Sequence, residues 1–341
     1  MNGSTRPVVV VARVDQPPPG LPEVETGAVY RFASDEGQIR DALVEAEALF
    51  AWNFSDLPWF RRTFVHARHL RWIHTAGVGI DPILCREVVE SPVIITNSGG
   101  VYERTMAEYA LMLMLQMAKD AVRTHEDQTR HLWNRRKTDT LQGRVLVIVG
   151  AGSIGTAIAR LSRVFGMTPL GIARSSRPSG TGFDAVYASH DLITVVERAD
   201  YIVLTAPLTP STIGLFDREA IAHMKPSARV INLGRGAVLD ESALIDALAQ
   251  GKIAGAALDV FHEEPLPESH PLWDLPNVVV SPHMSGDVFN THERFVTGFV
   301  NNLWHWVRGE PLEYVVDKSL GFRPHRIDAI GFPDTGGTVD A

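Results

Sequence analysis

The chain has 341 residues, 45% hydrophobic and 21% charged, so it is long enough to bury two sizeable cores. Its formal net charge of −8 argues against a nucleic-acid-binding or anionic-membrane-binding surface. No apolar run reaches the ~18 residues of a membrane span, and the polar start does not resemble a secretory signal. The single cysteine, Cys85, cannot form an internal disulfide, which favours the cytoplasm, and no Cys cluster or paired-His spacing predicts a metal site.

The first hundred residues predict an α/β unit. It begins with the apolar run 8–11 and continues as short strand and helix patterns to about residue 100. Residues 102–119 then predict a long helix that crosses to a second unit. Its apolar positions indicate core or subunit packing, and they include Met106, Ala110, Leu113 and Met117.

A glycine-rich turn follows. Residues 144–149 predict a buried strand and residues 154–165 a helix, with Gly150, Gly152 and Gly155 at the junction. The first glycine permits a tight turn, the second lets the backbone approach a pyrophosphate, and the third lets the helix lie close to the strand. The helix N-terminus offers unpaired N–H groups to phosphates. The candidate cofactor residues here are Gly150, Gly152, Ser153, Ile154 and Gly155.

The end of the next strand indicates which dinucleotide is bound. Residues 167–172 predict that strand, and an NAD site usually has an acidic residue at its end to bind the ribose hydroxyls. This chain has Ala173 there, followed by a basic stretch. Guanidinium and hydroxyl groups bind a 2′-phosphate, whereas a carboxylate would repel it. NADP(H) is therefore predicted, with NAD used less well, and the candidate residues are Arg174, Ser175 and Arg177.

Three later strands each end in a residue suited to hydride transfer. Arg235, Glu264 and His283 follow successive strand patterns, at the sheet edge where open α/β sheets bind ligands. The arginine can grip a carboxylate and polarise a carbonyl, and the histidine can donate a proton to the new alkoxide. The glutamate can orient the imidazole and favour its charged form. Each residue alone could be structural, but their joint placement predicts a catalytic set.

With these motifs the sequence resembles the D-isomer-specific 2-hydroxyacid dehydrogenase family from about Ile73 to Arg308. By the resemblance, Arg235, Glu264 and His283 match the catalytic positions, and Asp259 the aspartate that contacts the nicotinamide carboxamide. The turn Gly77, Val78, Gly79 matches the loop whose N–H groups hold the substrate carboxylate. The matching blocks include residues 75–81, 106–110, 150–155, 206–209, 224–226, 232–236, 258–261, 264–266 and 281–283, which add Ala206, Pro207, Leu233 and Gly234 to the expected cofactor site.

The resemblance implies two doubly wound parallel sheets: a Rossmann-type NAD(P)-binding domain and a flavodoxin-like substrate domain. We expect the first at residues 105–286 and the second at 1–104 and 287–320, with the active site in the crevice between them and a homodimer as the assembly. Residues 321–341, rich in Gly and Pro, are expected to be mobile or to contact a partner.

The predicted function is an NADP(H)-preferring reductase of small 2-keto acids such as glyoxylate or hydroxypyruvate. The alternatives are an NAD-linked dehydrogenase that oxidises a larger D-2-hydroxy acid, and a nucleotide-sensing regulator on the same fold. Formate oxidation is less favoured, because that branch is expected to carry glutamine in place of Glu264. The substrate side chain is expected near residues 51–54, Val78, Met284 and Trp133.

Overall fold

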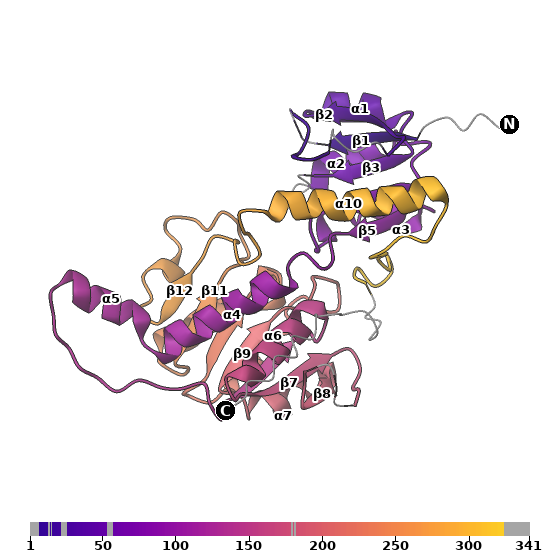
Figure 1. The fold of residues 1–341 in the computed structure, drawn as a ribbon. Helices are drawn as coiled ribbons and strands as arrows, with labels where there is room; N and C mark the ends of the chain where they lie inside the picture. The colour runs from indigo at the N-terminus through magenta and orange to yellow at the C-terminus, as the bar shows by residue number, and fades with distance from the viewer. Residues whose placement is uncertain are drawn as a thin grey trace, which may run out of the picture.

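Two parallel β-sheets form two units, which α4 (Glu103–Ala118) and α10 (Thr291–Arg308) connect (Figure 1). The computed structural model describes residues 7–323 except 13, 15, 22–25, 53–56, 179 and 181. The predicted fold class is confirmed. The tail expected at 321–341 lies, from residue 324 on, outside the described residues, as do positions 53–54 of the expected substrate pocket.

The first unit holds a five-stranded sheet in the flavodoxin-like order β2-β1-β3-β4-β5. The strands β1, β3 and β4 are almost wholly buried, as expected for a sheet covered on both faces, whereas the edge strand β2 is partly exposed. On one face lie α1 (Glu36–Leu43), α2 (Leu57–Phe64) and α3 (Arg86–Glu90); on the other, Phe295, Phe299 and Leu303 of α10 fill the core. The strands are β1 (Val8–Ala12), β2 (Val29–Ala33), β3 (Ala48–Ala51), β4 (Trp72–Thr75) and β5 (Ile94–Asn97).

The second unit holds a seven-stranded parallel sheet in the order β12-β11-β10-β9-β6-β7-β8. This is the Rossmann order with one additional strand, and the direction of winding reverses between β6 and β9. Ligands of such sheets bind beyond the carboxyl ends of the strands at that reversal. The strands are β6 (Val145–Val149), β7 (Thr168–Ala173), β8 (Ala185–Ala188), β9 (Tyr201–Leu204), β10 (Arg229–Asn232), β11 (Gly255–Leu258) and β12 (Val278–Val280).

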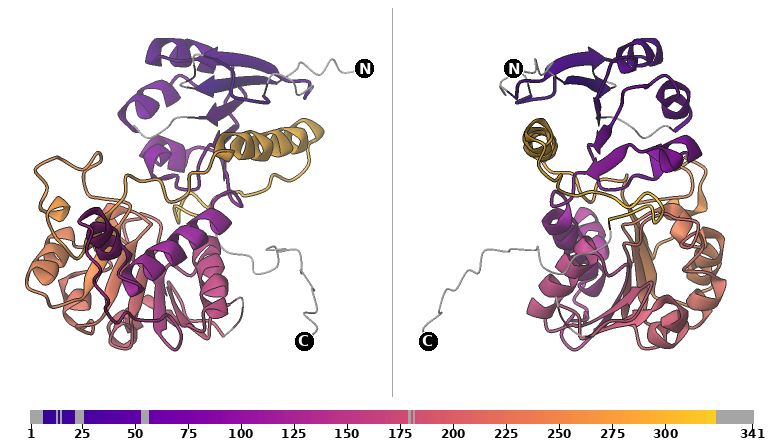
Figure 2. Two further views of the ribbon diagram at one scale, coloured as in Figure 1. Left: turned by 60° about the vertical axis from the view of Figure 1, so that its left-hand side comes forward. Right: turned by 90° about the vertical axis from the view of Figure 1, so that its right-hand side faces the viewer.

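Helices cover both faces of this sheet (Figure 2). One face carries α4 and α6 (Ser153–Val164), and the apolar stripe of α4 is mostly core: Met106, Ala110 and Leu113 are buried, whereas Met117 is only partly so. The other face carries α7 (Leu192–Val196), α8 (Arg218–Ala222) and α9 (Glu241–Ala249). A short polar helix, α5 (Ala121–Thr129), projects beyond the end of α4 (Figure 1).

No helix in the described part of the chain combines the length and apolar character that a membrane crossing requires.

Candidate active site

Three adjacent strand ends supply the predicted catalytic set. Arg235 follows β10, Glu264 follows β11 and His283 follows β12, and these strands are neighbours in the sheet. Parallel strands end at the same edge, so the three side chains reach one crevice. Gly236 is needed beside them, because a Cβ there would clash with the backbone of Phe261.

The ion pair between His283 and Glu264 is the centre of the site. The Nδ1 atom of His283 lies 2.7 Å from Oε2 of Glu264, whose Oε1 accepts from the Phe261 N–H at 2.9 Å. The hydrogen bond to Glu264, reinforced by its charge, raises the pKa of His283 despite burial and the Arg235 charge. Burial opposes ionisation of Glu264, but the hydrogen bonds from His283 and Phe261 outweigh it and lower its pKa. The pair therefore favours imidazolium, with Nε2 left to face a reactant.

The backbone at His283 is held in an unusual conformation. Its φ of +51° lies in the left-handed region, which costs a non-glycine residue about 1–3 kcal/mol and persists only where the surroundings impose it. The surroundings here are Asp259: its carbonyl accepts from the His283 N–H at 2.8 Å. Its fully buried carboxylate accepts from Ser281 Oγ at 2.6 Å, Met284 N at 3.0 Å and Ser285 N at 2.9 Å. Asp259 thus holds the loop that presents the imidazole; its expected contact with nicotinamide stays a prediction.

Arg235 reaches across to the first unit. Asp81 Oδ1 accepts from its Nε and lies 3.2 Å from its Nη2, while Nη1 donates to the Gly234 carbonyl at 2.8 Å. A Cβ on Gly79 would overlap the guanidinium, so this glycine allows the close approach. Because each terminal nitrogen of a guanidinium carries two N–H groups, Nη1 and Nη2 each retain one for a substrate carboxylate beside their contacts with Gly234 and Asp81.

The Gly77, Val78, Gly79 loop lies beside that guanidinium, with its peptide planes fixed. The carbonyl of Gly77 accepts from the Ser98 N–H at 3.0 Å, and the carbonyl of Val78 accepts from Asn97 Nδ2 at 2.8 Å. Since a trans peptide directs its N–H opposite to its C=O, the N–H groups of Val78 and Gly79 point away from Asn97 and Ser98. No described residue accepts a hydrogen bond from either group. They are available to an anion, as the predicted role requires.

The glycine turn fits a dinucleotide. Gly150 has φ +113°, and a Cβ there would lie 2.5 Å from Ala206 N; a Cβ on Gly155 would clash with the carbonyl of Gly150. Gly152 differs, because a Cβ there would meet nothing within 4 Å, so the space in front of the α6 N-terminus is open. An open cradle at a helix N-terminus suits a pyrophosphate. Ser153 and Ile154 begin that helix.

The other expected cofactor residues follow the strands β7, β9 and β10. A Cβ on Gly234 would lie 3.0 Å from the carbonyl of Ala206, and the Leu233 N–H donates to the carbonyl of Leu204, so the ends of β9 and β10 lie side by side. Ala206 is also the residue that a Cβ on Gly150 would meet, so both strand ends adjoin the glycine turn. Pro207 continues the segment after Ala206. Beyond β7, Arg174 and Ser175 are exposed, whereas Arg177 is partly buried and donates to the carbonyl of Ala151.

The sequence analysis did not predict every contact of the site. The pairing of Asp81 with Arg235 was missed, although Asp81 stands in the matching block 75–81. Of the expected substrate-pocket residues, Trp52 packs against His292 and Met284 is 44% exposed, while Trp133 is fully exposed on the segment after α5. Within the described ranges, no group of three or more His, Cys, Asp or Glu side chains is arranged to hold a metal ion.

Comparison with known proteins shows which family the chain is similar to. The family model described as D-isomer specific 2-hydroxyacid dehydrogenase, NAD binding domain, matches residues 111–285. A glyoxylate/hydroxypyruvate reductase B from Pectobacterium carotovorum is 37% identical over 261 residues, which cover 75% of this chain and 81% of that protein.

Solved structures show the same likeness. A D-isomer specific 2-hydroxyacid dehydrogenase family protein from Aeromonas salmonicida superposes with a TM-score of 0.78 at 30% identity, covering 92% of this chain and 100% of that one. A probable 2-hydroxyacid dehydrogenase from Rhizobium etli, in complex with NADP, HEPES and L(+)-tartaric acid, gives a TM-score of 0.80 at 25% identity, covering 93% and 100%.

Proposed function

This chain belongs to the D-isomer-specific 2-hydroxyacid dehydrogenase family, and from that membership we propose that it is an NADPH-preferring reductase of small 2-keto acids such as glyoxylate or hydroxypyruvate. The observation that carries the proposal is the meeting of Arg235 with Gly79 across the two units, beside the His283–Glu264 pair. A carboxylate-binding group and a proton donor thereby share one crevice.

Each residue of the site has its own role in the proposed reaction. The Arg235 fork and the N–H groups of Val78 and Gly79 bind the substrate carboxylate and place the adjacent carbonyl near His283. His283 Nε2 donates a proton to the carbonyl oxygen as negative charge develops on it. Glu264 keeps the imidazole oriented through Nδ1 and stabilises its protonated form. In the reverse direction the neutral imidazole takes the hydroxyl proton.

The cofactor, when bound, supplies or accepts the hydride. Gly150, Gly152 and the N-terminus of α6 would hold its pyrophosphate, and Ala206 with Gly234 would border it. Arg174 supports the choice of NADPH: it is exposed at the end of β7, where an NAD site would have a carboxylate. The NADP in the Rhizobium etli relative agrees with that choice. Arg177 is already engaged with Ala151, so its proposed contribution is mainly to hold the loop against the glycine turn.

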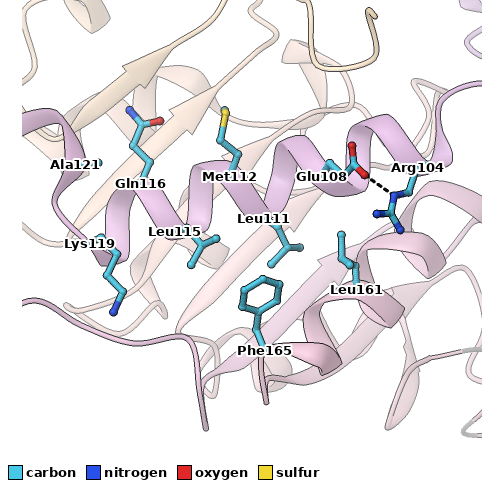
Figure 3. Close-up of a pocket in the computed structure, with 10 residues that line it drawn as sticks. All are labelled: Arg104, Glu108, Leu111, Met112, Leu115, Gln116, Lys119, Ala121, Leu161 and Phe165. Carbon is cyan, nitrogen blue, oxygen red and sulfur yellow. Dashed lines mark hydrogen bonds and ion pairs between the residues drawn. The ribbon is translucent and has the colours of Figure 1, made fainter. Parts of the chain in front are cut away.

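The proposed assembly is a homodimer formed over α4 and α6. A cavity of about 720 Å³ opens there, lined mostly by apolar side chains, with the Arg104–Glu108 ion pair at one end and Gln116 and Lys119 toward the other (Figure 3). Met112 and Phe165 are 44% and 39% exposed in it, and Trp133 is fully exposed beyond α5. Exposed apolar surface of this kind is covered well by a second copy of the chain. The apolar lining residues are Leu111, Met112, Leu115, Ala121, Leu161 and Phe165.

Initial rates test the function. Glyoxylate, hydroxypyruvate and larger 2-keto acids are compared with NADPH and NADH at fixed ionic strength. We expect the highest kcat/KM for NADPH with the two small acids. A preference for NADH with a larger acid would identify the NAD-linked alternative, and tight cofactor binding without turnover would identify the regulator.

A further inference from the structure

The chain after α10 is anchored on the first unit. Val316 N donates to the carbonyl of Ile95 in β5 at 2.9 Å, next to that sheet. The Lys318 ammonium donates to the carbonyls of Val88, at 3.1 Å, and Ser91, at 2.5 Å, at the end of α3. Residues 316–318 are therefore tied to the unit that carries the Gly77–Gly79 loop.

Residues 317–322, which we call the C-terminal turn, close on themselves. Asp317 Oδ1 accepts from Ser319 N at 2.9 Å, Ser319 Oγ at 2.6 Å and Leu320 N at 3.2 Å. The Gly321 N–H donates to the carbonyl of Asp317, and the Asp317 N–H donates to the carbonyl of Phe322. These bonds hold the turn together and fix the backbone of Phe322, from which its ring projects.

The C-terminal turn also touches the second unit, on both sides of the cofactor crevice. The Arg174 guanidinium lies over the Phe322 ring, 5.9 Å from its centroid. A Cβ on Gly321 would lie 3.2 Å from Thr209 Cγ2, in the segment that continues from Ala206 and Pro207. The hydrogen bond from Ser319 Oγ is the largest cause that lowers the pKa of Asp317, and desolvation opposes it. The backbone N–H groups of Leu320 and Ser319 and the charge of Arg174 lower this pKa further. The guanidinium of the exposed Arg174 side chain thus lies within cation–π distance of the turn.

We propose that Phe322 is a positioning residue for NADPH selection, whose ring holds the Arg174 guanidinium ready for the 2′-phosphate. The inference rests on the NADPH preference proposed above. An arginine side chain loses rotamer freedom when it binds a phosphate, and a partner that orders it beforehand reduces that loss. A cation over an exposed aromatic face supplies enough stabilisation for a roughly two- to fivefold change in affinity. Because ring and guanidinium come from different units, the substrate-binding unit takes part in cofactor choice.

Equilibrium binding of NADP⁺ and NAD⁺, measured by calorimetry on the full chain without substrate, tests the inference. We expect Phe322→Leu to weaken NADP⁺ by about two- to fivefold and to leave NAD⁺ unchanged, since NAD⁺ has no 2′-phosphate. Phe322→Trp keeps a ring beneath the guanidinium and should retain NADP⁺ affinity. In an Arg174→Ala background, Phe322→Leu should add nothing, because the group through which it acts is gone.

The outcomes separate this inference from the proposed function. If Arg174→Ala leaves the ratio of the two affinities unchanged, the NADPH assignment fails and the role of Phe322 with it. Suppose instead that Arg174→Ala lowers the affinity for NADP⁺ relative to that for NAD⁺, as the NADPH assignment requires. If Phe322→Leu then weakens the binding of both nucleotides equally, or of neither, only the role of Phe322 is overturned. Should Phe322→Leu lower the unfolding temperature, Phe322→Met, whose unbranched and flexible side chain adapts better to the space of a ring, replaces it under the same criteria.

Discussion

We expect Asp259→Asn to disturb the loop that carries His283 before it disturbs cofactor binding. In the structure, Oδ1 of Asp259 accepts from Ser281 Oγ and Met284 N, and Oδ2 accepts from Ser285 N. An asparagine keeps one acceptor but places an NH₂ group in the other position. That NH₂ would face the Ser285 N–H, donor against donor, in a site where the aspartate is fully buried.

The magnitude follows from the bonds that change. One hydrogen bond to a charged group, worth about 1.5–3 kcal/mol, is lost, and a buried N–H is left unpaired. A neutral amide is less costly to bury than a carboxylate, which offsets part of the loss. We therefore expect the free energy of unfolding to fall by about 2 kcal/mol, or roughly 4–8 °C in Tm for a domain of this size. Because φ at His283 depends on the same loop, kcat should fall at least about tenfold.

Thermal unfolding, kcat and the Kd for NADP⁺ are measured together, with Asp274→Asn as the matched control. Asp274 is exposed and its carboxylate makes no hydrogen bond to any described residue, so the control should behave as the parent protein. If Asp259→Asn weakened NADP⁺ while Tm stayed unchanged, the carboxylate would serve the nicotinamide and not the loop, and our reasoning from its hydrogen bonds would be refuted.

The remaining predictions concern the crevice. His283→Ala should lower kcat by about 10²-fold or more with little change in cofactor Kd; equal turnover would remove His283 from the mechanism. Glu264→Gln removes the charge that helps to raise the pKa of His283, so the imidazolium loses its proton at a lower pH. The upper pH limit of keto-acid reduction should therefore move down. An unchanged pH profile of kcat/KM would mean that Glu264 has only a structural role. Arg235→Lys should raise KM for the keto acid and lower kcat, since an ammonium cannot replace the fork; parent kinetics would exclude carboxylate anchoring. Arg174→Ala should raise KM for NADPH by about tenfold and leave KM for NADH unchanged. A change of about tenfold is the low end of the range for a hydrogen bond to a charged group, because this arginine is exposed and screened by salt. An equal rise in both KM values would contradict phosphate binding.

The sequence predicted the nucleotide-binding core well because each signal there is local. Residues 144–149 are a continuous apolar run, and the structure makes 145–149 the strand β6. The glycine at 150 stands where a positive φ is needed, next to the helix that begins at Ser153. Such signals are contained in one strand, one turn and one helix, and tertiary context did not override them.

The sequence could not show pairings between distant segments. Asp81 and Arg235 meet only because the first unit packs over the ends of β10 and β11, and Phe322 reaches Arg174 only because Lys318 anchors the C-terminal turn to α3. The α5 helix was also missed. Its sequence is mostly polar, with no apolar stripe, and ion pairs from Arg136 to Asp120 and Asp127 hold that region instead.

The most direct test of the central claim is the stoichiometry of one reaction. Glyoxylate is incubated with NADPH and the purified chain near neutral pH, and NADPH loss is compared with glycolate formed, in the parent protein and in His283→Ala. We predict one glycolate for each NADPH oxidised, with turnover lower by about 10²-fold or more in the variant. NADPH loss without glycolate, or equal rates in the two proteins, would contradict hydride transfer to a keto acid with His283 as the proton donor.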